Sequence, residues 1–237
     1  MRLNKHIAET GFCSRREADR LIAEKRVTLN GLPTGIGSKV IEGDEVRVDG
    51  QPLLARRPAS ATRNHVYIAL NKPVGITCTT ETAIGGNIID FVDHRERIFP
   101  VGRLDKESEG LILLTSNGDI VNEILRSENR HEKEYLVGVN KPITQQFLSG
   151  MARGVRLHHK MTQPCKATRL AKFGFRIILT QGLNRQIRLM ANEFGYRVTE
   201  LRRVRIVNIK LGALKVGQWR NLTDAELRGL LPERTIW

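Results

Sequence analysis

The spacing of apolar residues predicts two short helices in the first quarter of the chain. The apolar face of the first helix consists of Leu3, Ile7 and Ala8. Gly11 ends this helix as a left-handed cap. Ser14 begins the second helix, because Glu17 follows it at the spacing of a capping box. The apolar stripe of the second helix consists of Ala18, Leu21 and Ile22.

Strand-like alternation follows these helices at Val27–Leu29 and at residues 44–48. Each of the two segments ends in a two-residue hairpin signal, Asn30-Gly31 and Asp49-Gly50. The pattern therefore predicts a compact unit of helices and short strands over residues 1–55.

The segment after this unit has hardly any residues that could enter a core. Residues 56–64 are small, polar or basic, and Pro58 disfavours a helix. We expect a flexible linker there. Residues 65–237 are then long enough for a second, larger domain.

Strand patterns outnumber helical patterns in residues 65–237. We predict strands at residues 66–70, 111–114, 134–139, 175–179 and 205–211, and helices at residues 119–125 and 184–194. The strands do not alternate regularly with helices, as they would in a doubly wound parallel sheet. The pattern therefore predicts an α+β domain whose mixed sheet is mainly antiparallel.

Composition changes this picture mainly through charge. Lys and Arg total 39 against 25 Asp and Glu, which gives a net charge of +14. A polyanion is the natural partner of such a chain, because neutralising phosphates releases condensed counterions. Part of the excess is clustered on the outer face of the second predicted helix, at Arg15, Arg16 and Arg20.

Membrane association is not expected. No apolar run approaches the roughly 20 residues of a spanning helix, and no signal-like apolar stretch follows residues 1–5. We therefore expect a cytoplasmic protein. The cysteines Cys13, Cys78 and Cys165 are far apart in sequence and form no CxxC pair, so neither a disulfide framework nor a metal site is indicated.

Residues 102–110 form a polar loop, bounded by glycines, that leads directly into the predicted strand at 111–114. Asp105 would stand at the edge of a rigid element, which is a common way to hold a reactive group. Arg103 and Lys106 are close in sequence, and a nearby cation favours the ionised carboxylate that a nucleophile requires. Taken alone, the pattern also fits a turn or cap aspartate.

Two further segments carry candidate site residues. Arg185 and Arg188 are three residues apart in a predicted helix, where a guanidinium can bind a phosphate or a carboxylate. A solvated basic helix face is the alternative for this pair. Lys133 and Tyr135 lie on a predicted strand, and in an RNA enzyme such a tyrosine can stack on an extruded base.

Together these segments resemble the RsuA-like family of bacterial ribosomal RNA pseudouridine synthases, and within it the members that act on large-subunit ribosomal RNA. The first unit resembles the alpha-L RNA-binding motif of that family at Gly11, Ser14-Arg15-Arg16, Val27, Asn30-Gly31, Gly43-Asp44 and Val48-Asp49-Gly50. The larger unit matches at Asn71-Lys72-Pro73-Val74-Gly75, Gly102-Arg103-Leu104-Asp105, Lys133-Glu134-Tyr135, Asn184-Arg185-Gln186-Ile187-Arg188, Leu201-Arg202-Arg203-Val204-Arg205-Ile206 and Gly217-Gln218-Trp219-Arg220. Six motifs in the family's order make this resemblance specific. The residues that depart from the family's usual pattern, Gln181, Leu183 and Leu189, bear on RNA contacts more than on the chemistry.

The resemblance implies that a uridine is detached at its glycosidic bond, rotated, and rejoined through ring carbon five, without a cofactor or a metal. Asp105 would be the catalytic nucleophile, and Tyr135 would pack against the flipped uracil. Arg188 would pair with Asp105, and Arg185 stays open as the alternative partner. The residues expected to contact RNA are Arg15, Arg16, Arg20, Arg103, Lys133 and Arg185. The expected partner is ribosomal RNA, transfer RNA stays open as a second substrate, and a monomer is expected.

Two other functions fit parts of the sequence. A ribosome-associated factor that binds RNA without catalysis would explain residues 1–55 and the charge, but not the aspartate and arginine motifs of the larger unit. An RNA methyltransferase would need a glycine-rich cofactor loop after a strand, and Gly85-Gly86 is a poor substitute.

Overall fold

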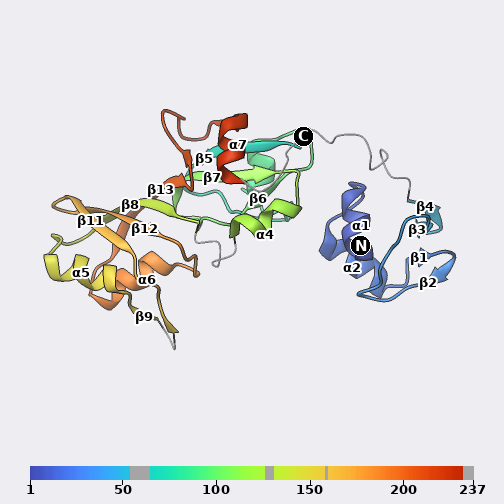
Figure 1. Cartoon of the computed structure of the whole chain (residues 1–237), viewed down its shortest axis with the longest axis horizontal. Helices are drawn as coiled ribbons and strands as arrows, with labels where there is room; N and C mark the ends of the chain where they lie inside the picture. Colours follow the sequence, from blue (N-terminus) through green and yellow to red (C-terminus); the bar gives the residue numbers. More distant parts are fainter. Residues whose placement is uncertain (54–64, 126–130, 158–159, 232–237) are drawn as a thin grey trace. The chain divides into compact units, whose positions relative to one another are not determined.

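The computed structural model describes residues 1–53, 65–125, 131–157 and 160–231. The segment predicted as a linker, residues 56–64, lies outside these ranges. The chain divides into two compact units, residues 1–63 and 64–237 (Figure 1).

The N-terminal unit combines two helices with a small antiparallel sheet (Figure 1). The helices are α1 (Leu3–Glu9) and α2 (Arg15–Ala23), and the strands are β1 (Val27–Leu29), β2 (Leu32–Pro33), β3 (Val46–Val48) and β4 (Gln51–Pro52), in the order β2-β1-β3-β4. Both predicted hairpin turns form with left-handed backbone at each of their two residues: φ is 51° and 80° at Asn30 and Gly31, and 50° and 76° at Asp49 and Gly50. Apolar residues of both helices and of β1 and β3 share one buried core.

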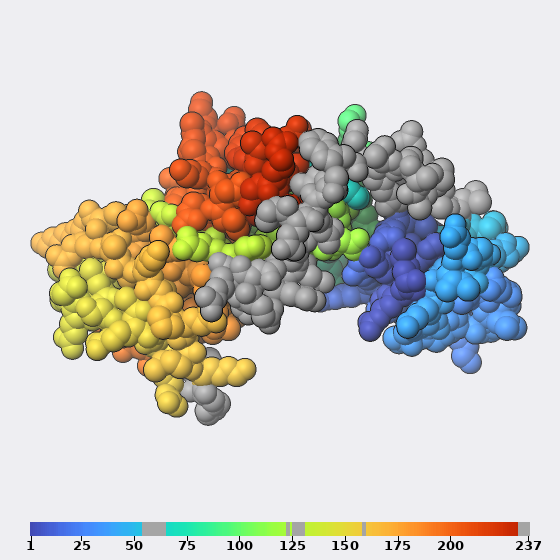
Figure 2. Space-filling view, viewed as in Figure 1, coloured from blue at the N-terminus to red at the C-terminus, as the bar shows by residue number. Residues whose placement is uncertain are grey.

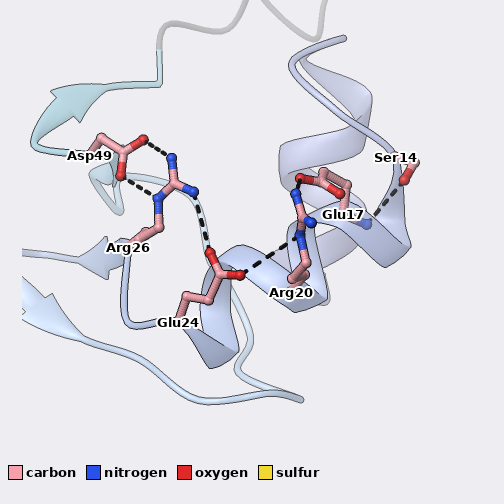
Figure 3. A network of polar contacts seen from close by, with 6 residues as sticks. All are labelled: Ser14, Glu17, Arg20, Glu24, Arg26 and Asp49. Atoms are coloured by element: carbon pink, nitrogen blue, oxygen red, sulfur yellow. Dashed lines mark hydrogen bonds and ion pairs between the residues drawn. The ribbon is translucent and has the colours of Figure 1, made fainter. Parts of the chain in front are cut away.

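The start of α2 forms half of the predicted capping box. The Ser14 hydroxyl accepts a hydrogen bond of 3.0 Å from the Glu17 backbone N–H. The Glu17 carboxylate does not complete the box, because it pairs with Arg20 one turn further along the helix (Figure 3).

The larger unit is built on one nine-stranded sheet. Its strands are β5 (Tyr67–Lys72), β6 (Phe99–Val101), β7 (Glu109–Thr115), β8 (Lys133–Val139), β11 (Lys166–Ala171), β12 (Gly174–Leu179), β13 (Val198–Ile206), β14 (Ile209–Lys210) and β15 (Trp219–Asn221). The order is β11-β12-β8-β13-β7-β5-β15, with β14 paired to β13 and β6 paired to β7. Only the β13–β7 pair is parallel within this sheet as described, which confirms the predicted α+β class with a mixed, mainly antiparallel sheet.

Helices complete this unit on both faces of the sheet. They are α3 (Ile88–Val92), α4 (Asp119–Leu125), α5 (Gln145–Arg153), α6 (Gln186–Glu193) and α7 (Asp224–Leu230), and a separate hairpin is formed by β9 (Arg156–Leu157) and β10 (Lys160–Met161). Alternate residues of β7 enter two different cores, which explains its unbroken apolar run. We call the face of the sheet that shares a core with α3, α5 and α6 the inner face. At the surface, α5 and β11 lie side by side, in yellow and orange (Figure 2).

The centre of the sheet is a very short contact between β7 and β13. These strands pair only at Arg202 with Glu109 and at Arg203 with Gly110. Gly110 has a φ of +104°, and a Cβ built on it would lie 2.3 Å from the Arg203 carbonyl oxygen. A glycine is therefore required for the strand that follows the Asp105 loop to approach β13 so closely.

The prediction of one strand over residues 205–211 was wrong. The strand β13 ends at Ile206, the chain turns at Val207 with a φ of +51°, and β14 pairs back so that Ile206 faces Ile209. Both isoleucines enter the same core, so the apolar alternation continues across a turn that it does not reveal.

None of the helices in the described ranges is long and apolar enough to cross a membrane.

Candidate active site

Asp105 lies in the loop between β6 and β7, at the middle of the sheet. The loop is tied down on both sides of this residue: the Ser108 N–H donates to the Asp105 carbonyl at 3.0 Å, and the Gly75 N–H donates to the Lys106 carbonyl at 2.8 Å. Leu104 is buried in the inner-face core, whereas 25% of the Asp105 side chain is exposed. The carboxylate is thus held in place but open to a ligand.

Arg188 of α6 lies beside this carboxylate. Its Nε is 3.8 Å from Asp105 Oδ2, and its side chain is 14% exposed. The remaining guanidinium nitrogens are held elsewhere, because Nη2 donates to Ser108 Oγ at 3.1 Å and Nη1 donates to the Val198 carbonyl at 3.3 Å. These contacts fix the guanidinium independently of Asp105.

Arg185 takes a different position, although it is only three residues from Arg188. It is the N-cap of α6, with a φ of 51°, and its Nη1 donates to Glu107 Oε2 at 3.0 Å. The two arginines therefore have different anionic partners, although both contact the loop that contains Glu107. Of the two candidates left open by the sequence, Arg188 is the one that forms an ion pair with Asp105.

Tyr135 belongs to the inner face of β8. It is 9% exposed and shares the buried core with Leu104, the residue before Asp105. The guanidinium carbon of Arg203 lies 6.0 Å from the centroid of its ring. Tyr135 is therefore packed into the same core as the residue before the nucleophile, and Arg203 of β13 lies over its ring.

Lys72 is a buried cation that was not among the site residues predicted from the sequence. It is fully buried at the end of β5, and its Nζ donates to the carbonyls of Pro73 at 2.8 Å and Ile76 at 2.9 Å. Burial lowers the pKa of Lys72, while the thiol of Cys78 and the carboxylate of Asp105 oppose that shift. The sequence did indicate this residue through the Asn71–Gly75 motif, because a lysine is uncommon at the end of a buried strand.

Comparison with known proteins identifies the family. Residues 66–193 match the family model of the RNA pseudouridylate synthases, and residues 1–46 match that of the S4 domain. The chain belongs to the RNA pseudouridylate synthase family. It is an isomerase of the RsuA-like group with an S4-type RNA-binding module, as the motifs predicted.

Individual relatives cover nearly the whole of this synthase. It is 56% identical over 227 residues to the "Dual-specificity RNA pseudouridine synthase RluF" of Escherichia coli K12, which covers 96% of this chain and 77% of the relative. It is 32% identical over 238 residues to the "Ribosomal large subunit pseudouridine synthase B" of Bacillus subtilis, which covers 97% and 95%. A solved structure, "Crystal structure of pseudouridylate synthase", is 28% identical with a TM-score of 0.71, and the match covers 97% of this chain and 99% of that one.

The residues expected to contact RNA in this synthase differ in their surroundings. Arg103 is exposed within the nucleophile loop, two residues before Asp105. Lys133 is only 8% exposed, and its Nζ donates to the His131 carbonyl at 3.3 Å, so it faces the interior beside Tyr135 and not the open surface. Burial, followed by the charge of Arg203, lowers the pKa of Lys133 to about 8.

The S4 module of the synthase offers fewer free charges than its sequence suggested. Arg20 is paired with Glu17 and Glu24 (Figure 3). Arg15 and Arg16 are exposed and form no ion pair within the described residues. The charge available to phosphates on α2 is therefore concentrated at its start.

Among the described residues, no group of three or more His, Cys, Asp or Glu side chains is arranged to hold a metal ion.

Proposed function

We propose that this synthase converts uridine to pseudouridine at defined positions of large-subunit ribosomal RNA, and that transfer RNA is a second substrate. The observation that carries the proposal is the position of Arg188, whose Nε lies 3.8 Å from the Asp105 carboxylate. Support for the two RNA classes comes from relatives, since one is named a dual-specificity RNA pseudouridine synthase and another a large-subunit synthase.

Asp105 is the nucleophile in this proposal. Its carboxylate is partly open, and Arg188 stabilises its anionic form in a pocket from which bound RNA displaces water. Because Arg188 is anchored by Ser108 and Val198, it can do this without occupying the carboxylate oxygens with short hydrogen bonds.

The target base reaches Asp105 by leaving its stack. Base-modifying enzymes extrude the nucleotide because the reacting atoms are inaccessible inside a helix. Tyr135 would pack against the extruded uracil, since its ring belongs to the core that also contains Leu104, the residue before Asp105. Docking of the RNA would rest on exposed cations, namely Arg15 and Arg16 of the S4 module and Arg103 and Arg185 around the site.

All three residues of the proposed chemistry, Asp105, Tyr135 and Arg188, come from one chain, so the proposal includes a monomeric enzyme. It also places the enzyme in the cytoplasm, where its RNA substrates are made and assembled.

The test is tritium release from RNA that carries tritium at uridine C5. The full-length chain, with no added cofactor, is expected to release tritium, because C5 loses its hydrogen after bonding to the sugar. Large-subunit ribosomal RNA and transfer RNA are supplied separately, and the product is mapped by comparing RNA from wild-type and deletion strains. If neither RNA gains pseudouridine although the enzyme binds both, the proposal is contradicted. Turnover of only one RNA would limit it to that class.

A further inference from the structure

Two buried cations lie beside Tyr135 and outside the Asp105–Arg188 pair. Lys133 precedes Tyr135 by two residues on β8, so both side chains point to the inner face. Arg203 stands opposite Tyr135 on β13. The exposed fractions of Lys133 and Arg203 are 8% and 3%.

Arg203 is firmly held but has donors to spare. Its Nε donates to the Leu111 carbonyl of β7 at 2.7 Å, and its guanidinium lies over the Tyr135 ring. Its Nη2 is buried without a hydrogen-bond acceptor among the described residues. Lys133 uses one donor, toward the His131 carbonyl at 3.3 Å, which is a long hydrogen bond.

The two cations lack an anionic partner in the described part of the chain. The ion pairs among the described residues of this region involve Arg188, Arg202 and Arg205, but neither Lys133 nor Arg203. Burying a charge without a partner, or a donor without an acceptor, is unfavourable. Burial and Arg203 lower the pKa of Lys133 to about 8, which still leaves it protonated at neutral pH. The missing acceptor therefore points to a ligand.

The burial of Lys133 and Arg203 indicates which part of the RNA they would bind. A phosphodiester is hydrated and continues into the chain on both sides, so it suits the exposed Arg103 better than a position that is less than 10% exposed. An extruded uracil is flat and carries two carbonyl oxygens on the edge of its ring, so these oxygens can reach a buried donor. Tyr135, which the proposed function assigns to that uracil, is a neighbour of both cations, along β8 for Lys133 and across to β13 for Arg203.

We propose that Arg203 Nη2 and Lys133 Nζ donate hydrogen bonds to the carbonyl oxygens of the extruded uracil and stabilise its negative charge after it leaves the sugar. This inference rests on the proposed function and adds two catalytic residues to it.

The need for such donors follows from the bonds that change. As Asp105 Oδ bonds to C1′ of the sugar, the C1′–N1 bond breaks, and its electron pair stays on the ring, shared between N1 and the two carbonyl oxygens. After rotation, C5 bonds to C1′ and the carboxylate leaves; C5 then loses its proton and N1 gains one. Fixed donors at the oxygens act while the ring carries the charge, which is where preorganised donors accelerate a reaction most.

The test compares uridine with 5-fluorouridine at the target position, under single turnover at saturating RNA. Fluorine withdraws electrons and makes the detached ring a better anion, so it replaces part of the help that the donors supply. We expect Arg203→Met and Lys133→Met to slow consumption of uridine by on the order of 100-fold, as when one oxyanion donor is removed, but consumption of 5-fluorouridine by at most about tenfold. Chromatographic separation of the digested nucleosides, followed by mass spectrometry, measures both. Arg203→Lys, which keeps a cation, should fall between wild type and Arg203→Met.

Arg202→Met is the matched control, because Arg202 is the next residue of β13 but pairs with Glu109; it should not change the ratio of the two rates. Equal slowing of uridine and 5-fluorouridine would overturn the inference and leave Arg203 as a support for the Tyr135 ring. Unchanged rates would also overturn it. If Arg203→Met does not fold, Lys133→Met and Arg203→Lys decide the matter by the same ratio. A wild-type chain that forms no pseudouridine would instead contradict the proposed function.

Discussion

Arg188 approaches Asp105 without hydrogen-bonding to it. The Nε–Oδ2 distance is 3.8 Å, longer than a hydrogen bond, while the Nη atoms of the same guanidinium are bonded to Ser108, Glu107 and Val198. The arginine thus supplies a fixed positive charge and leaves the carboxylate oxygens free. A nucleophile needs this combination, because a tightly bound oxygen attacks poorly.

Replacing Arg188 should therefore impair catalysis more than binding. We expect Arg188→Ala to lose nearly all activity and Arg188→Lys to lose most of it, since lysine cannot reproduce three anchored donors. Single-turnover rates at saturating RNA are the measurement. Arg185→Ala is the matched control, because Arg185 pairs with Glu107. A normal rate for Arg188→Ala combined with an inactive Arg185→Ala would contradict the assignment.

The substitution Asp105→Asn removes the nucleophile but keeps the shape of the loop. We expect no pseudouridine, with RNA affinity changed by less than about tenfold, or ~1.4 kcal/mol. The reason is that binding is spread over many cations, whereas the chemistry depends on one carboxylate. Filter binding and tritium release measure the two effects separately. Turnover at a near-normal rate would eliminate Asp105 as nucleophile.

The S4 module should bind RNA through Arg15 and Arg16 more than through Arg20. The double variant Arg15→Gln/Arg16→Gln is expected to weaken binding and to reduce the slope of log K against log salt by roughly 1.5, because each lost phosphate contact removes about 0.7–0.9. Arg20→Gln should have a smaller effect, since Glu17 and Glu24 already neutralise that charge. Equal slopes for all variants would mean that this helix does not contact phosphate.

The contact between β7 and β13 should not tolerate a side chain at Gly110. A Cβ there would lie 2.3 Å from the Arg203 carbonyl oxygen, and the φ of +104° disfavours other residues. We expect Gly110→Ala to lower the free energy of unfolding by roughly 3 kcal/mol and to reduce activity, as overpacking and backbone strain add. Urea unfolding measures the loss. Gly85→Ala is the control, because a Cβ at Gly85 would have no other atom within 4 Å.

Lys133 should make stability depend on pH in the alkaline range. Its pKa is about 8 in the folded chain against an ordinary value of 10.5, so between these values the unfolded chain binds more protons. The free energy of unfolding contributed by this residue therefore rises with pH from about 8 to 10.5, by roughly 3 kcal/mol at most. The measurement is the difference between wild type and Lys133→Met across this range. A difference that stays constant with pH would contradict the lowered pKa of the buried lysine.

The sequence by itself determined the local elements and the motif that carries the chemistry. Asn30-Gly31 makes its two-residue turn because these residues accept left-handed backbone, and Ser14 begins α2 because its hydroxyl can accept a helix N–H. The run at Leu111–Leu114 becomes a central strand because it is apolar on both faces. Each of these preferences acts between residues at most a few positions apart, so it can be predicted from the sequence without knowledge of the fold.

Only the tertiary structure decided which charged groups meet. Arg188 reaches Asp105 and Arg185 does not, because α6 begins at Gln186 and leaves Arg185 in a left-handed cap. The burial of Lys133 and Arg203 depends on strands β7, β8 and β13, which lie far apart in the sequence and come together only in the folded sheet. Ion pairing and burial depend on distances through space, which residue order along the chain does not contain.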